Sequence, residues 1–129
     1  LENFIDIEGW QDESLFPSYI ASGSIGISPL HRNIHHDTTY ANKLFQYMSF
    51  GKPVLVSNAT AQKNLIEKTN SGMVHEERNS VDFENKVLQL FEDKMFRDTR
   101  GNNGKRFVEE EFCWEKTSKG LINLYDNLN

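Results

Sequence analysis

The stretch from residue 38 to residue 57 constrains the fold most strongly, because it joins a short amphipathic helix to a buried strand. Thr38 or Thr39 is expected to cap a helix over residues 40–50, which a glycine ends. A proline then opens a strand over residues 53–57, whose centre is a continuous apolar run. A helix placed in this way in an α/β protein has free backbone N–H groups at its N-terminus, where a phosphate can bind. If a phosphate binds there, the stretch forms a nucleotide or nucleotide-sugar site.

Strands and helices alternate along the rest of the chain. Further strands are expected at residues 3–7, 24–28 and 72–75. Further helices are expected at residues 12–22, 61–69, 81–91, 95–112 and 114–128. Because parallel strands need crossover connections, this order predicts an α/β fold: a three-layer, Rossmann-like domain with a short parallel sheet covered on both faces. The length of 129 residues predicts a single domain over residues 1–129.

Polar loops follow the predicted strands at their carboxyl ends, where open α/β sheets bind ligands. These loops are expected at residues 9–11, 29–37 and 57–61, on one rim of the sheet. The second loop contains His31, His35, His36 and Asp37. Their spacing matches no standard zinc pattern, so a solvated loop over residues 31–37 is predicted. The alternative is that one histidine contacts a ligand.

Composition excludes several classes of protein. The net charge of −5 argues against a general nucleic-acid surface. The single cysteine, Cys113, excludes a disulfide framework and fits a reducing, cytoplasmic location. No apolar run approaches the roughly 20 residues of a transmembrane segment. Cys113 is expected to be a buried structural thiol, with Trp114 and Tyr125 pinning the last helix to the domain.

The helix over residues 40–50 carries the candidate binding residues. The backbone N–H groups of Tyr40, Ala41 and Asn42 could meet a phosphate, and Lys43 could add a positive charge. The alternative is an ordinary capped helix with a solvated lysine. Gln46, on the same side as Lys43, could donate or accept a hydrogen bond with a ligand hydroxyl, or it could simply be a surface glutamine.

The run NKLFQYM at residues 42–48, followed by GKPV at residues 51–54, carries a family resemblance. Looser matches flank it: a strand ending in glycine and a hydrophobic residue at 4–10, GMV at 72–74, and a closing N…V…F.W…LY pattern at 102–125. Along nearly its whole length the chain resembles the C-terminal, donor-binding part of GT-B glycosyltransferases, in the retaining family 4 of group 1.

The resemblance implies that a sugar is transferred from a nucleotide-diphosphate sugar, a UDP- or GDP-sugar, to an acceptor with retention. No metal and no other cofactor is expected, because amides and basic side chains neutralise the diphosphate in such sites. A role in bacterial surface polysaccharide or lipopolysaccharide synthesis is implied. So is a cytoplasmic location, with peripheral contact to the inner membrane face through a missing domain.

The resemblance also assigns roles to residues. The family signature is two glutamates separated by seven residues, and Thr38 and Gln46 stand at those positions. Gln46 would bind the ribose hydroxyls as a neutral partner, with a hydrogen bond weaker by about twofold than a charge-assisted one. Thr38 would lie near the sugar, and the amides of residues 40–42 would hold the phosphates or the sugar. Trp10 and Pro29 would lie near the base.

The same resemblance makes residues 1–129 a partial domain. The acceptor domain, and a strand–helix–strand unit that normally opens the donor domain, would precede this sequence. The chain alone is therefore expected to be inactive, and to self-associate through an exposed strand edge if it exists alone. Two rival functions stay open: a nucleotide-sugar 2-epimerase of the same architecture, and a non-catalytic nucleotide-sugar-binding module.

Overall fold

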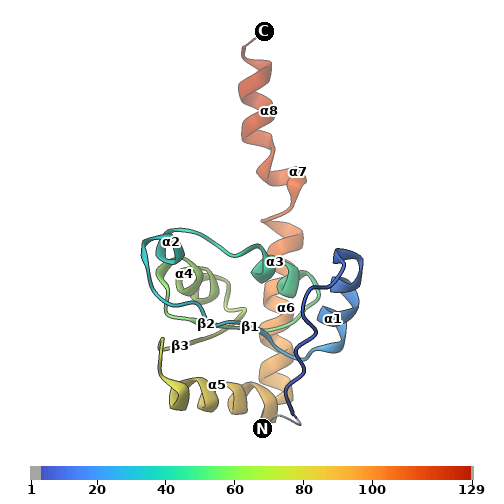
Figure 1. Cartoon of the computed structure of the whole chain (residues 1–129). Helices are drawn as coiled ribbons and strands as arrows, with labels where there is room; N and C mark the ends of the chain where they lie inside the picture. The colour runs from blue at the N-terminus through green and yellow to red at the C-terminus, as the bar shows by residue number, and fades with distance from the viewer. Residues whose placement is uncertain (1–3, 129) are drawn as a thin grey trace.

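An open, parallel, three-stranded sheet forms the centre of the molecule (Figure 1). We analysed a computed structural model, which describes residues 4–128. The strands are β1 (Gly26–Ser28), β2 (Val54–Ser57) and β3 (Gly72–His75), in the order β1-β2-β3. The register places Ile27 beside Leu55, and Leu55 beside Met73. The α/β fold and the short parallel sheet predicted from the sequence are confirmed.

Helices connect and flank the strands in the predicted order. They are the 3-10 turn η2 (Glu13–Leu15), α1 (Phe16–Ser22), α2 (Ile34–Thr38), α3 (Asn42–Ser49), α4 (Thr60–Thr69), α5 (Ser80–Glu92), α6 (Lys94–Glu110), α7 (Trp114–Thr117) and α8 (Lys119–Asp126). Helix α6 packs against both α3 and α4, and α5 packs against β3 (Figure 1). The predicted alternation of helices with the strands is therefore present in the structure.

The hydrophobic core lies between the sheet and α3 and α4. Val54 and Val56 of β2 are fully buried, and alternation along a strand directs both to the same face. They form one cluster with four buried side chains of the two helices: Leu44, Met48, Leu65 and Ile66. On the opposite face, Ile27 of the edge strand β1 stays 37% exposed, so this face is covered less completely than the first.

Gln62 ties α4 to the carboxyl ends of two strands. Its side chain is 1% exposed, and its Nε2 donates to the Ser28 carbonyl at 3.1 Å and to the Ser57 hydroxyl at 2.7 Å. The Ser28 hydroxyl donates back to Gln62 Oε1 at 3.1 Å. A buried amide with all these hydrogen bonds holds the bonded strand ends in place, because moving them would leave buried polar groups without a hydrogen-bond partner. Gln62 therefore fixes the rim where β1 and β2 end.

Two predictions about secondary structure were wrong. Residues 4–7 form no strand, and residue 3 lies outside the described residues. Phe4 and Ile7 are 90% and 86% exposed. Among the described residues, no strand lies beside this segment to pair with it. The predicted loop at 31–37 contains the helix α2, whose N-cap is Asn33: its side-chain oxygen accepts from the backbone N–H of His36.

The C-terminal region also differs from the prediction. Instead of one helix pinned to the domain, α7 and α8 form two short helices that extend away from it (Figure 1). Trp114 and Tyr125 are 72% and 63% exposed, so neither side chain pins the last helix to the domain. Cys113 is half-buried rather than buried. Across residues 4–128, no helix is both long and apolar enough to cross a bilayer.

Candidate functional site

Helix α3 begins without a capping side chain. Its N-cap is Ala41, and no side chain within residues 4–128 accepts a hydrogen bond from its first N–H groups. The prediction that Thr38 or Thr39 caps this helix was wrong, because both residues end the preceding helix α2. The Thr38 hydroxyl donates to the Ile34 carbonyl at 2.7 Å, and the Thr39 hydroxyl donates to the His35 carbonyl at 2.7 Å. The N-terminus of α3 is therefore open to a polar ligand.

A cavity of about 670 Å³ lies between α3 and the chain segment that includes α1. Three residues predicted for the site from the sequence line it together: Trp10, Lys43 and Gln46. Trp10 comes from the N-terminal segment, whereas Lys43 and Gln46 lie one turn apart on α3. The fold thus brings together residues separated by more than 30 positions in the sequence. The remaining lining residues are Asp6, Glu8, Gly9, Gln11, Phe16, Tyr19, Ile20, Gly23, Ile25, Gly26, Tyr47 and Lys52.

Lys43 is half-buried in the wall of the cavity. Burial lowers its pKa from the ordinary value of 10.5, because a charged ammonium group loses hydration there. An anion bound beside this ammonium group would replace part of the lost hydration with a favourable charge interaction. The half-buried lysine and the uncapped helix N-terminus therefore favour the same kind of ligand.

Aromatic side chains form much of the remaining wall. Tyr47 packs against the backbone of Gly26 so closely that a Cβ built on this glycine would lie 2.3 Å from Tyr47 Cδ2. Burial raises the pKa of Tyr47, so its hydroxyl stays protonated. Phe16 and Tyr19 of α1 line the opposite side, and Trp10 contributes an exposed indole. Flat aromatic surfaces of this kind suit a planar ligand group.

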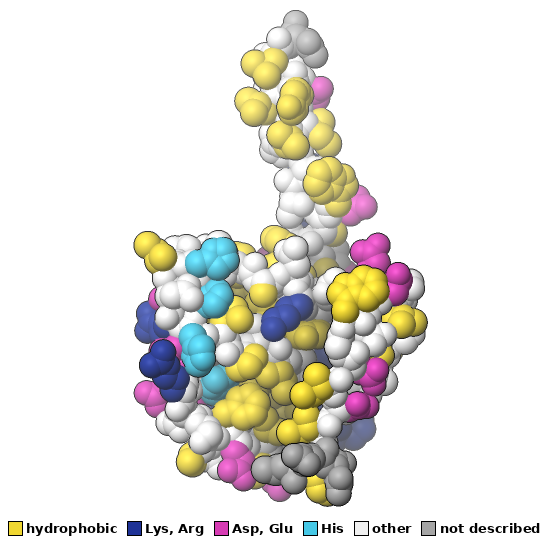
Figure 2. All heavy atoms as spheres, in the orientation of Figure 1, with side chains coloured by type: hydrophobic (Ala, Val, Ile, Leu, Met, Phe, Trp, Pro, Cys, Tyr) yellow, Lys and Arg dark blue, Asp and Glu magenta, His cyan; other side chains and the backbone are white. Residues whose placement is uncertain are grey.

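Charge is divided unevenly between the two sides of the cavity. Asp6 and Glu8 lie on the side of Tyr19. Loss of hydration around Tyr19 raises the pKa of its hydroxyl, and the nearby carboxylates of Glu8 and then Asp6 raise it further. In the space-filling view, hydrophobic side chains are exposed in the middle of this face, with carboxylates on the side of α1 (Figure 2).

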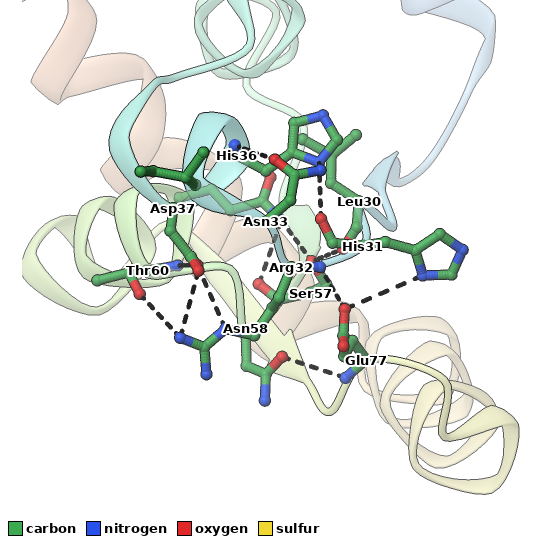
Figure 3. A network of polar contacts seen from close by, with 12 residues as sticks. Leu30, His31, Arg32, Asn33, His36, Asp37, Ser57, Asn58, Thr60 and Glu77 are labelled. Atoms are coloured by element: carbon green, nitrogen blue, oxygen red, sulfur yellow. Dashed lines mark hydrogen bonds and ion pairs between the residues drawn. The ribbon is translucent and has the colours of Figure 1, made fainter.

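A network of polar contacts organises the rim beyond β1 and β2 (Figure 3). The carboxylate of Asp37 accepts from the backbone N–H of Thr60 at 2.7 Å and pairs with Arg32 Nε at 3.3 Å. The Thr60 backbone N–H lowers the pKa of Asp37 most, and the Arg32 guanidinium lowers it further. Glu77, which follows β3, accepts from the backbone N–H of Arg32, and its own N–H donates to Asn58 Oδ1 at 3.2 Å. Loops after all three strands are thus joined on one rim.

The histidines of this rim contribute to structure. The Nδ1 of His36 lies 2.6 Å from the His31 carbonyl and 3.0 Å from Asn33 Nδ2. Histidine side chains gather along the side of the face below α2 (Figure 2). Within residues 4–128, however, no group of three or more histidine, cysteine, aspartate or glutamate side chains is placed to hold a metal ion.

The other predicted site residues lie outside the cavity. Pro29 follows β1 and is exposed on the rim. Tyr40 packs edge-on against Phe45, with ring centroids 5.9 Å apart. Ala41 and Asn42 form the N-terminus of α3 next to Lys43. Their roles in binding stay predictions.

Sequence reasoning missed several lining residues. Tyr47 lies on the same helix face as Lys43 and Gln46, and its ring lines the cavity with them. Lys52 was used only as part of a motif, but its Nζ donates to the Ala21 carbonyl at 2.8 Å and so joins the end of α3 to α1. The strand pattern over residues 3–7 gives no indication that Asp6 and Glu8 line a cavity.

Comparison with known proteins identifies the family. The family model described as "Glycosyl transferases group 1" matches residues 1–93. The chain belongs to the group 1 glycosyltransferases. This group 1 glycosyltransferase chain is 30% identical over 82 residues to an uncharacterized glycosyltransferase of Methanocaldococcus jannaschii. The match covers 64% of this chain but only 23% of that relative.

Two solved structures share the fold of this group 1 glycosyltransferase chain. A sucrose-phosphate synthase of Thermosynechococcus elongatus superposes with a TM-score of 0.79 at 19% identity, covering 93% of this chain and 29% of the other. The C-terminal domain of a group 1 family glycosyl transferase of Francisella tularensis gives a TM-score of 0.69 at 20% identity. That match covers 82% of this chain and 52% of the other. The fold is thus that of GT-B glycosyltransferase C-terminal domains.

Proposed function

We propose that this chain forms the donor-binding part of a retaining glycosyltransferase, and that its ligand is a nucleotide-diphosphate sugar. The observation that carries the proposal is the meeting of Trp10, Lys43 and Gln46 in one cavity beside the open N-terminus of α3. These side chains offer an aromatic surface, a positive charge and a hydroxyl-binding amide. A base, a diphosphate and a ribose need those three kinds of contact.

The proposed orientation follows from charge. The diphosphate lies toward the N-terminus of α3, where the N–H groups of Asn42 and Lys43 have no side-chain partner and the helix dipole is positive. Tyr40 and Ala41 form the approach to this end, and Thr38 lies nearer the sugar. The Gln46 amide, one turn further along the helix, binds the ribose hydroxyls.

The base then lies against Trp10, whose indole is 88% exposed and so free to stack. Pro29, on the rim after β1, borders this region in the proposal. Thr39 lies beside Thr38 at the start of the phosphate region. Amides and the ammonium group of Lys43 neutralise the diphosphate, so the proposal includes no metal.

We place the acceptor-binding part of the enzyme outside residues 1–129, because the chain spans about a quarter of the length of the curated relative that it matches. Residues 1–129 are then a partial domain that is inactive without the rest. The proposed setting is cytoplasmic synthesis of a bacterial surface polysaccharide or lipopolysaccharide. An isolated chain would expose the free edge of β1, where Ile27 is 37% exposed, and would self-associate there.

Calorimetry with UDP and GDP tests this function on the natural protein that carries this sequence. We expect at least one of the two nucleotides to bind, and Gln46→Ala to weaken binding by about two- to tenfold through loss of a neutral hydrogen bond. Gln89→Ala, on the exposed side of α5, is the matched control and should leave affinity unchanged. If neither nucleotide binds, the proposed function is wrong. If Gln46→Ala binds as tightly as the wild type, Gln46 does not belong to the site.

One observation favours a second function, a non-catalytic nucleotide-sugar-binding module. Gln46 is neutral at a position where the family signature has a carboxylate. A module of this kind would bind the donor but neither transfer nor hydrolyse the sugar. An assay for free nucleotide separates the two functions. The protein is incubated with a nucleotide-diphosphate sugar, with and without acceptor extracts, and only an enzyme will cleave the sugar from the nucleotide.

A further inference from the structure

The cavity has a basic side and an acidic side. Lys43 and Gln46 project from α3, whereas Asp6 and Glu8 belong to the segment that leads to α1. Loss of hydration raises the pKa of the Tyr19 hydroxyl, and the nearby Glu8 and then Asp6 carboxylates raise it further. The acidic side is therefore built around Glu8 and Tyr19.

A tight turn places Glu8 beside the proposed stacking surface. Gly9 has a φ of +67°, a backbone conformation that favours glycine, and Trp10 follows it directly. The side chain of Gln11 closes the turn, because its Nε2 donates to the Glu8 carbonyl at 2.8 Å. The Glu8 carboxylate and the Trp10 indole thus leave the same short turn and line the same cavity.

Charge favours one direction for a nucleotide diphosphate in this cavity. Its phosphates are repelled by Asp6 and Glu8 and attracted by Lys43 and the N-terminus of α3, whereas the other lining lysine, Lys52, has its Nζ bonded to the Ala21 carbonyl. The base must therefore lie at the acidic end. A carboxylate accepts hydrogen bonds and donates none at neutral pH, so the base has to present donors there.

We propose that the cavity selects guanine, with the Glu8 carboxylate accepting hydrogen bonds from N1–H and the N2 amino group while the base stacks on Trp10. This inference rests on the proposed nucleotide-binding function and names the base. Guanine carries two adjacent donors on this edge, which match the two oxygens of a carboxylate. Uracil offers a single N–H between two carbonyl oxygens, which the carboxylate repels. Adenine offers its amino group beside a ring nitrogen that only accepts.

Calorimetry with GDP, UDP and inosine diphosphate tests this selectivity on the natural protein that carries this sequence. We expect GDP to bind at least about tenfold more tightly than UDP, because hydrogen bonds to a charged group are among the stronger ones. Inosine diphosphate lacks only the N2 amino group, so its affinity should fall between the two. Equal affinity for GDP and UDP, or tighter binding of UDP, would overturn the inference and leave the proposed function standing. Absence of binding for all three would overturn the proposed function itself.

A pair of variants tests the role of Glu8. Glu8→Gln keeps the shape but replaces one acceptor oxygen by an NH₂ group, so it should reduce the preference for GDP to within about threefold of UDP. Glu13→Gln is the matched control, because Glu13 is exposed, lies in the next turn η2 and does not line the cavity. Thermal unfolding of both variants checks that the fold is retained. A full preference for GDP in folded Glu8→Gln would contradict the assignment of Glu8.

Discussion

The close packing of Tyr47 on Gly26 gives a prediction that links the fold to the cavity. In Gly26→Ala, the new Cβ would lie 2.3 Å, 2.4 Å and 2.8 Å from the Cδ2, Cγ and Cβ atoms of Tyr47. Carbon atoms in favourable contact are about 3.5–4.0 Å apart, so the tyrosine or the strand must move by roughly 1 Å or more. Overpacking of this kind typically lowers the free energy of unfolding by about 1–3 kcal/mol.

The cavity offers the displaced Tyr47 ring a space into which it can move. Tyr47 and Gly26 both line the cavity, so the ring can shift into this open volume. We therefore expect Gly26→Ala to weaken nucleotide binding as well as to lower stability. Urea unfolding followed by circular dichroism measures the free energy of unfolding, and calorimetry measures the affinity.

Two controls make the prediction for Gly26→Ala specific. Gly120→Ala adds a Cβ that meets nothing within 4 Å, so it should not destabilise the protein and could stabilise α8 by up to about 1 kcal/mol. In a Tyr47→Ala background, Gly26→Ala should cost much less than it does in the wild type, since its clashing partner is absent. An unchanged stability of Gly26→Ala, or an equal loss in both backgrounds, would refute the reasoning.

Further predictions follow from buried and charged groups. Gln62→Ala removes the buried hydrogen-bond partner of Ser28 and Ser57, so it should lower the free energy of unfolding by about 2–4 kcal/mol. Gln89→Ala, at an exposed position, should lower it little. Equal losses for the two variants in urea titrations would contradict this prediction. The pKa of Asp37 is lowered in the folded state, so its contribution to stability is present above the unfolded pKa near 3.8 and is lost as the pH falls through the lower folded value. Unfolding midpoints measured from pH 6 down to about pH 2 should therefore fall less steeply in Asp37→Asn than in the wild type; parallel curves would rule out this role.

The sequence predicts the centre of the fold well, because its signals are local there. The apolar run of β2, bounded by a proline and a serine, is buried at every position, as the run predicts. Helix α3 shows a clear apolar face, with Leu44 and Met48 buried. These elements carry their own burial pattern, so no knowledge of distant residues is needed to place them.

Other elements depend on partners that a sequence pattern does not reveal. Residues 4–7 alternate like a strand, but a strand also needs a neighbouring strand, and this segment has none among the described residues. Helix α2 is only five residues long and carries two histidines and an aspartate, so it shows no apolar helix pattern. The one sequence feature that indicates a helix there is the capping residue Asn33. Because the sequence pattern predicts a loop in place of α2, it also places Thr38 and Thr39 at the start of α3, whereas the structure places them at the end of α2.

The candidate site was predictable on one side only. Lys43 and Gln46 follow from helix spacing, and Trp10 from a family resemblance, and all three line the cavity. The acidic side, with Glu8 and Tyr19, depends on how the N-terminal turn folds back against α1. That placement arises from tertiary packing and left no periodic signal in the sequence.

The central claim is that a nucleotide diphosphate binds between Trp10 and the N-terminus of α3, and an NMR titration tests it most directly. The protein has two tryptophans, and Trp114 lies on α7, away from the cavity, so its indole N–H is an internal control. Adding GDP should shift the indole N–H of Trp10 and the backbone N–H signals of Asn42 and Lys43, while Trp114 stays unchanged. Shifts confined to Trp114, or to residues outside the cavity such as Arg100, would contradict the account.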